Sequence, residues 1–179
     1  MKPRNENRRP VHVYTGNGKG KTTAAVGQAA RAAGHNRNVL FMFFNKKPNI
    51  SGEENSLKKI GVTVEYFSSQ YPVNKRKKKL KERVSIQTRK GIEFVLKAFH
   101  SGNYDYIIMD EILVSVRDKY LKEEELLKLI DEKPENTELL LTGRGATESV
   151  IANADIVSKV VNVKHPYKKG DKCKKATEY

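Results

Sequence analysis

Short apolar runs alternate along the chain with segments in which apolar residues recur at helical spacing. The short runs are rich in Val, Ile, Leu, Phe and Tyr, as β-strands are. They are Val11–Tyr14, Val39–Phe44, Val62–Phe67, Tyr106–Met109, Thr137–Leu141 and Ile156–Val163. Most are apolar at successive positions and not at alternate ones, which predicts strands covered on both faces, as in a parallel sheet.

Helices are predicted between several of these strands. An alanine-rich segment, 22–33, meets Gly34, a typical helix-ending residue, and apolar residues recur at helical spacing from about Arg76 to His100. A third helix is predicted over 123–131, before Pro134. Strands separated by helices imply right-handed βαβ units. We therefore predict an α/β fold: a doubly wound, mostly parallel sheet of about six strands with helices on both faces.

Length and composition indicate one domain over residues 1–179, since a chain of 179 residues is long enough for one core and too short for two. Residues 1–9 are predicted to form a flexible basic arm. No apolar run approaches the roughly 20 residues needed to cross a bilayer, and the N-terminus lacks the apolar stretch of a signal peptide. With a lone cysteine, Cys173, these features predict a cytoplasmic protein and no membrane partner.

The chain carries 35 Lys and Arg against 21 Asp and Glu, a formal charge of +14, which favours an anionic partner. The densest basic run is 75–79, followed by Lys81 and Arg83. Because no aromatic residues are interleaved to stack on bases, we interpret it as a solvated helix face and do not expect a nucleic-acid partner.

The segment T-G-N-G-K-G-K-T-T joins the first predicted strand to the first predicted helix. It ends in Gly20-Lys21-Thr22, as the phosphate-binding pattern G-x-x-x-x-G-K-[ST] does, while Thr15 stands at the first glycine of that pattern. Glycines let backbone N–H groups turn toward phosphate, and the helix N-terminus adds its positive dipole end. We therefore predict a P-loop NTPase-like fold and a nucleotide site made by Thr15, Gly16, Asn17, Gly18, Lys19, Gly20, Lys21, Thr22 and Thr23.

Charged residues that could bind a metal ion or phosphate follow two other predicted strands. Asp110 and Glu111 follow one apolar strand, and Arg144 follows another between two glycines. Ligands of doubly wound sheets bind beyond the carboxyl ends of the strands, so we predict that Thr22, Asp110 and Glu111 hold Mg²⁺ or Mn²⁺ and that Arg144 forks onto a triphosphate or a carboxylate. The alternatives are a carboxylate pair that caps the next segment and an exposed arginine in a turn.

These residues leave the reaction open, because hydrolysis, phosphoryl transfer and attack elsewhere on the nucleotide use the same cradle. In order along nearly its full length, however, the chain resembles the P-loop type of ATP:corrinoid adenosyltransferase. That family also carries Thr at the first glycine of the generic pattern. The matching segments are 15–25, 29–35, 52–57, 109–111, 141–145 and 163–167, with Gly170 and the terminal Glu178 and Tyr179.

The resemblance implies an enzyme that transfers the 5′-deoxyadenosyl group of ATP to the reduced cobalt of a corrinoid and releases triphosphate, in adenosylcobalamin synthesis or salvage. It implies that Lys21, Glu111 and Arg144 are catalytic, that an electron donor reduces the cobalt, and that the enzyme is a homodimer. Because monovalent cobalt is itself the nucleophile, no general base is required.

On the corrinoid side, the resemblance implies roles for Tyr71 and His165 and a tail, 164–179, that packs near the active site. The family carries an aromatic Gly-Phe-x-Trp-like stretch that faces the corrin, whereas this chain has no Trp and offers Tyr71 as the substitute. The end of the second strand, Phe44–Lys47, also departs from the family pattern. Two alternatives stay open: an ATP-dependent regulatory module that binds nucleic acid, and a small P-loop ATPase or kinase, which would release diphosphate.

Overall fold

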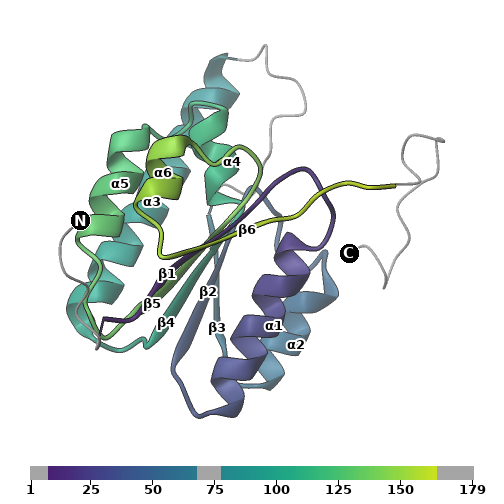
Figure 1. Cartoon of the computed structure of the whole chain (residues 1–179), viewed down its shortest axis with the longest axis vertical. Coiled ribbons are helices and arrows are strands. Elements are labelled where there is room, and N and C mark those ends of the chain that lie inside the picture. Colours follow the sequence, from purple (N-terminus) through teal and green to yellow (C-terminus); the bar gives the residue numbers. More distant parts are fainter. Residues whose placement is uncertain (1–7, 68–77, 165–179) are drawn as a thin grey trace.

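Six parallel strands form one sheet, in the order β3-β2-β4-β5-β1-β6 (Figure 1). The computed structural model describes residues 8–67 and 78–164. The strands are β1 Val11–Thr15, β2 Val39–Phe44, β3 Thr63–Phe67, β4 Tyr106–Asp110, β5 Glu138–Thr142 and β6 Ile156–Lys159. Every pairing between them is parallel, so all their carboxyl ends lie at one edge of the sheet. The predicted α/β fold is confirmed.

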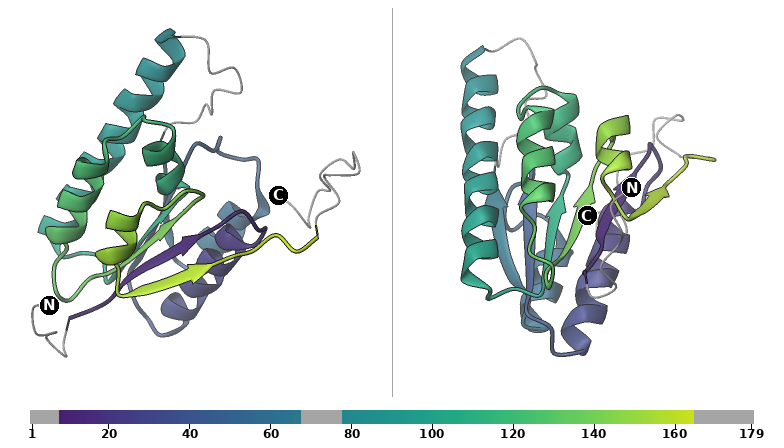
Figure 2. Two further views of the ribbon diagram at one scale, coloured as in Figure 1. Left: turned by 45° about the horizontal axis from the view of Figure 1, so that its top comes forward. Right: turned by 60° about the vertical axis from the view of Figure 1, so that its left-hand side comes forward.

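Helices cover both faces of this sheet, as predicted. They are α1 Lys21–Gly34, α2 Gly52–Lys59, α3 Lys78–Ser101, α4 Ile112–Arg117, α5 Glu123–Asp131 and α6 Glu148–Ala152. Two separate cores reflect the two layers: one packs α1 and α2 against one face, and the other packs the remaining four helices against the opposite face (Figure 2). The inner strands are thus shielded from water on both sides, which favours the carboxyl edge of the sheet as the place for a site.

The four inner strands are buried along almost their whole length, whereas the two edge strands are not. β3 is partly exposed and β6 is exposed at all four positions. β6 also ends at Lys159, four residues before the predicted end at Val163. Its neighbour β1 stops at Thr15, and Gly16 then turns away with a φ of 100°, so the regular strand pairing ends there.

Three short helices, α2, α4 and α6, were not predicted, while α1, α3 and α5 begin and end within about two residues of the predicted bounds. In the described part of the chain, none of the helices combines the length and the apolar character that crossing a membrane requires. The basic arm is described only at its last residues, where the Arg9 amide donates to the Glu135 carbonyl at 2.7 Å. Tyr71 and His165 lie outside the described residues.

Candidate active site

The segment between β1 and α1, predicted to be a phosphate loop, turns at two glycines with left-handed backbone conformations. Gly16 and Gly20 have φ angles of 100° and 113°, a region in which a side chain would be strained. Lys21 opens α1 and is only 5% exposed. Its ammonium group donates to the Gly18 carbonyl at 2.7 Å, which holds the side chain back over its own loop.

The pKa of the Lys21 ammonium group is lowered by its surroundings. Burial lowers it most, and Arg144 lowers it further, while Glu111 and then Asp110 act in the opposite direction. A negatively charged ligand beside the lysine would favour its protonated form. A triphosphate would supply that charge.

The segment that follows β6 packs against the backbone of the phosphate loop. The Gly18 amide donates to the Val160 carbonyl at 2.8 Å, and the Val160 amide donates to the Thr15 carbonyl at 2.8 Å. A Cβ atom at Gly16 would collide with the Val160 carbonyl, and one at Gly18 would lie 2.7 Å from the Val161 carbonyl. The glycines therefore serve close packing as well as turning, and the Gly18 amide is satisfied within the protein.

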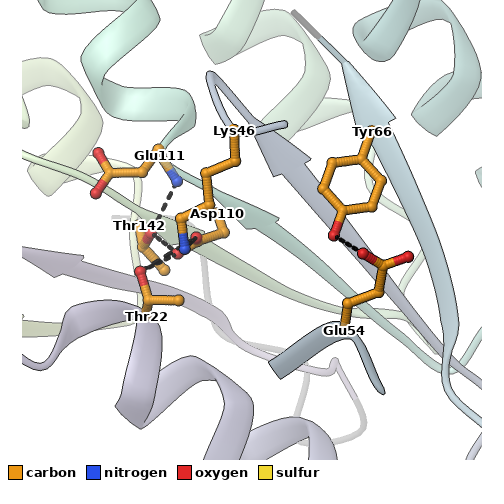
Figure 3. A network of polar contacts seen from close by, with 7 residues as sticks. All are labelled: Thr22, Lys46, Glu54, Tyr66, Asp110, Glu111 and Thr142. Atoms are coloured by element: carbon orange, nitrogen blue, oxygen red, sulfur yellow. Dashed lines mark hydrogen bonds and ion pairs between the residues drawn. The ribbon is translucent and has the colours of Figure 1, made fainter. Parts of the chain in front are cut away.

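Asp110, at the end of β4, accepts hydrogen bonds from two threonines (Figure 3). Thr22, the second residue of α1, lies 3.0 and 3.1 Å from its two carboxylate oxygens, and Thr142, at the end of β5, lies 2.7 Å from Oδ1. Asp110 itself is fully buried. β5 lies between β4 and β1 in the sheet, and Thr142, at its end, is paired in register with Tyr14 of β1 while it donates to Asp110.

Glu111 lies beside this network and is turned away from it. Its φ angle of 65° ends β4 and starts α4, and its amide donates to Thr142 Oγ1 at 2.9 Å. Figure 3 shows its carboxylate extending away from that of Asp110. Burial, and then the charge of Asp110, raise the pKa of the Glu111 carboxyl, while Lys21, Lys46 and Arg144 oppose the rise.

Lys46, which sequence analysis did not assign to the site, reaches the same acid. Its ammonium nitrogen lies 3.4 Å from Asp110 Oδ2 and 4.9 Å from the centre of the Phe43 ring. The signal that could have found it is its position: it stands just after β2, at the same carboxyl edge as Asp110. Lys46, after β2, is therefore a third cation at this edge, beside Lys21 after β1 and Arg144 after β5.

Arg144 occupies a tight turn after β5. Its neighbours Gly143 and Gly145 have φ angles of 138° and 81°, and the arginine between them is exposed. Its charge lowers the pKa values of both Lys21 and Glu111, and the strand that it follows, β5, lies next to β1 in the sheet. The turn is tied to β1 where the Ala146 amide donates to Thr15 Oγ1 at 3.2 Å.

The structure thus brings Thr15, Gly16, Gly18, Gly20, Lys21, Thr22, Asp110, Glu111 and Arg144 to one edge of the sheet. The side chains of Asn17, Lys19 and Thr23 are exposed on the loop and the first turn of α1.

A second buried carboxylate, Glu54 of α2, stands beside the site and fixes the segment that carries Lys46. It accepts a hydrogen bond from the Tyr66 hydroxyl at 2.7 Å (Figure 3). It also accepts from the Asn49 amide at 2.8 Å and the Lys58 ammonium at 2.7 Å. These donors, with Lys58 first, lower the pKa of Glu54 to about 2, whereas burial and the Glu54 carboxylate raise that of the Tyr66 hydroxyl.

The described residues fit a magnesium ion bound with a nucleotide. The Thr22 hydroxyl and the Asp110 carboxylate are hard oxygen donors within hydrogen-bond distance of each other. No group of three or more His, Cys, Asp or Glu residues that could hold a metal occurs in the described ranges. Mg²⁺ in nucleotide sites is bound in this way, through one or two protein oxygens together with phosphate oxygens.

Comparison with known proteins points to one family. A family model described as ATP:corrinoid adenosyltransferase BtuR/CobO/CobP matches residues 7–179. The corrinoid adenosyltransferase of Escherichia coli (strain K12) is 31% identical over 169 residues, which are 94% of this chain and 85% of that protein. The corrinoid adenosyltransferase CobA of Salmonella typhimurium (strain LT2) is 32% identical over 174 residues, 97% of this chain and 87% of that protein.

Solved structures with similar folds are more distant in sequence. The KaiC-like protein PH0186 from Pyrococcus horikoshii OT3 has a TM-score of 0.58 at 17% identity and covers 89% of this chain and 75% of its own. The flagellar accessory protein FlaH from Methanocaldococcus jannaschii has a TM-score of 0.60 at 13% identity and covers 85% of this chain and 71% of its own. At these identities the likeness concerns the fold alone.

Proposed function

The chain belongs to the ATP:corrinoid adenosyltransferase family, and from that premise we propose how its own residues divide the work of the reaction. The enzyme is a transferase that moves the adenosyl group of ATP to a corrinoid. One contact carries the assignment of residues: the Thr22 hydroxyl lies 3.0 Å from the buried Asp110 carboxylate, at the mouth of the phosphate loop. The family match does not favour the two alternatives, a nucleic-acid-binding module and an ATPase or kinase.

In the proposed reaction, the cobalt of the reduced corrinoid attacks the C5′ carbon of ATP. The electron pair of the monovalent cobalt forms the Co–C bond, the C5′–O bond breaks, and the triphosphate leaves with the electrons of that bond. No proton is transferred to or from the protein in this step. The protein therefore acts by orienting C5′ toward the cobalt and by offsetting charge on the triphosphate.

We assign the triphosphate to the phosphate loop, Lys21 and Arg144. Lys21 is a buried cation whose pKa is lowered chiefly by burial, so a leaving group that gains negative charge would be stabilised beside it. Arg144 sits on a glycine-flanked turn from which its guanidinium can fork onto phosphate oxygens. Asn17, Lys19 and Thr23 are proposed to line the outer rim of the same loop.

We assign magnesium, or manganese, to Thr22 and Asp110. The ion would supply Lewis-acid stabilisation of the phosphate oxygens. Glu111 is proposed as a catalytic group that acts through charge, because its carboxylate extends away from Asp110 while supporting the protonated form of Lys21. Thr142 holds the Asp110 carboxylate and the Glu111 amide at once and so keeps the two acids apart.

Other properties of the enzyme are proposed from family membership. We expect a homodimer in the cytoplasm and an electron donor that reduces the cobalt before transfer. Tyr71 and His165 stay predicted contacts on the corrinoid side, and the tail 164–179 is predicted to lie near them.

The proposal is tested by incubating the protein anaerobically with MgATP and chemically reduced cobalamin. The corrinoid spectrum and the phosphate products are followed together, for the wild type, Lys21→Ala and a control, Lys97→Ala, which removes an exposed lysine of α3. We expect light-sensitive adenosylcobalamin with equimolar triphosphate, and a loss of at least about a hundredfold in Lys21→Ala alone. Diphosphate as the product, or an equal effect of both substitutions, would overturn the assignment.

A further inference from the structure

The segment that carries Lys46 is fixed at both of its ends. Asn45 and Asn49 both take left-handed backbone conformations, with φ angles of 61° and 60°. The Asn45 amide donates to the Phe67 carbonyl at 3.2 Å, and its side chain donates to Ser115 Oγ at 3.2 Å. At the other end, Glu54 accepts the Asn49 amide. The short stretch between them is therefore held over the site, and Lys46 is the residue of that stretch that reaches into it.

Lys46 provides the counter-charge of a carboxylate that has no access to water. Asp110 is fully buried, and a buried carboxylate is costly unless it is paired. The two threonines give it neutral donors, and the ion pair that the described residues give it comes from Lys46, at 3.4 Å from Oδ2. The ammonium group thus compensates a charge that a bound metal ion could also compensate.

The ion pair between Lys46 and Asp110 is long and partly open to water. The Lys46 side chain is 31% exposed, and its distance to Asp110 is longer than the 2.7 to 2.9 Å of a strong charge-assisted hydrogen bond. Its nitrogen also lies 4.9 Å from the centre of the Phe43 ring, a contact that adds only a weak attraction. An incoming triphosphate offers several oxygens, and a flexible lysine can move to them at small cost.

We propose that Lys46 occupies the cation position on Asp110 until the nucleotide arrives, and that the triphosphate then draws it away and admits the divalent metal. The inference rests on the proposed metal role of Asp110. Its consequence is that free Mg²⁺ or Mn²⁺ binds weakly to the protein alone and strongly only together with the polyphosphate. Lys46 is thus a positioning residue that couples the two ligands.

The test is metal binding without any corrinoid. Mn²⁺ is titrated into the nucleotide-free protein and the free ion is measured by electron paramagnetic resonance, for the wild type, Lys46→Met and Lys47→Met. Lys47 is the matched control, since it is the adjacent exposed lysine and has no ion pair among the described residues. We expect Lys46→Met to bind Mn²⁺ about five- to tenfold more tightly than the wild type, and Lys47→Met to match the wild type.

Two further measurements locate the effect. In the double variant Lys46→Met/Asp110→Asn, the gain in Mn²⁺ affinity must disappear, because the gain belongs to the Asp110 site. With saturating inorganic triphosphate, the factor by which the polyphosphate improves Mn²⁺ binding must be smaller in Lys46→Met than in the wild type, by about the same five- to tenfold. Lys46→Arg, which keeps the charge, must keep the weak binding of the wild type.

The inference is overturned if Lys46→Met binds Mn²⁺ no better than Lys47→Met, or if the gain survives in the double variant. These outcomes are separate from those of the adenosylation assay, because no ATP or corrinoid is present. Failure of adenosyl transfer with the expected Mn²⁺ behaviour would remove the proposed residue roles in the reaction and leave the lysine exchange in place. Thermal unfolding of each variant verifies that the proteins compared are folded.

Discussion

Figure 3 shows two buried carboxylates, Asp110 and Glu54. Each has three protein partners, but the partners differ in kind. Glu54 is 3% exposed and bound by an amide, a phenol and a lysine of its own helix, all at 2.7 or 2.8 Å. Asp110 is bound by two hydroxyls, one of them from the phosphate loop, and by a more distant lysine. The partners of Glu54 saturate it and belong to the fold, whereas we propose that those of Asp110 are exchanged for ligands. Burial alone does not distinguish a functional carboxylate from a structural one.

The largest expected effect is on activity, from Asp110→Asn. The substitution keeps the shape of the side chain and removes the charge that would hold the metal, so we expect kcat/KM for adenosyl transfer to fall by about a hundred- to a thousandfold. The free energy of unfolding should change by less than about 1 kcal/mol, since the threonine hydroxyls can still donate to the amide oxygen. The measurements are product formation and urea unfolding. If Asp110→Asn loses as much stability as a core substitution does, Asp110 is a structural carboxylate like Glu54.

The matched substitution at the other carboxylate, Glu54→Gln, should have the opposite profile. We expect about 2 kcal/mol of stability to be lost, because charge-assisted hydrogen bonds from Lys58, Asn49 and Tyr66 are weakened together. Activity per folded molecule should stay within about threefold of the wild type, since Glu54 touches no predicted ligand group. If kcat falls as it does for Asp110→Asn while stability holds, the distinction between the two carboxylates fails.

The smallest expected effect is that the difference in stability between the wild type and Glu54→Gln depends on pH. The folded protein lowers the pKa of Glu54 from 4.5 to about 2, so the ionised side chain contributes stability that is fully present above pH 4.5. That contribution is lost as the pH falls through 4.5 toward 2, where the folded form also takes up a proton. Urea unfolding of the wild type and Glu54→Gln should therefore converge over this range. A gap that stays constant down to pH 2 would mean that the charge of Glu54 is not what stabilises the fold.

Much of the fold follows from local sequence, because the inner strands are continuous apolar runs. Val39–Phe44 is six apolar residues long, and its observed bounds equal the predicted ones. α4 was missed because its sequence, I-L-V-S-V-R, lacks a polar face, and its start depends on the left-handed backbone of Glu111. α2 was missed because G-E-E-N-S-L-K-K buries only Glu54 and Leu57, and a mostly polar octamer resembles a loop.

For the site, the position of each strand end was predictable and the partners of the side chains were not. The rule that ligands gather at the carboxyl ends of parallel strands predicts that Gly16, Asp110 and Arg144 share an edge. It does not predict that Thr142 bridges Asp110 and Glu111, because that contact depends on β5 lying between β4 and β1. Lys46 was missed for a related reason: a lysine after a strand is common, and only the fixed turn around it directs it to the acid.

The close contact between the phosphate loop and the segment after β6 has a consequence for how this protein can evolve. On one side of the contact stand glycines, and on the other side chiefly the backbone of Val160 and Val161. Every amino acid brings the same carbonyl group to a chain, so positions 160 and 161 can drift without losing the hydrogen bond to Gly18. Positions 16 and 18 cannot drift, because any side chain occupies the space that the backbone needs. In descendants of the protein, we therefore expect glycine to be kept at positions 16 and 18, while the residue types at positions 160 and 161 vary.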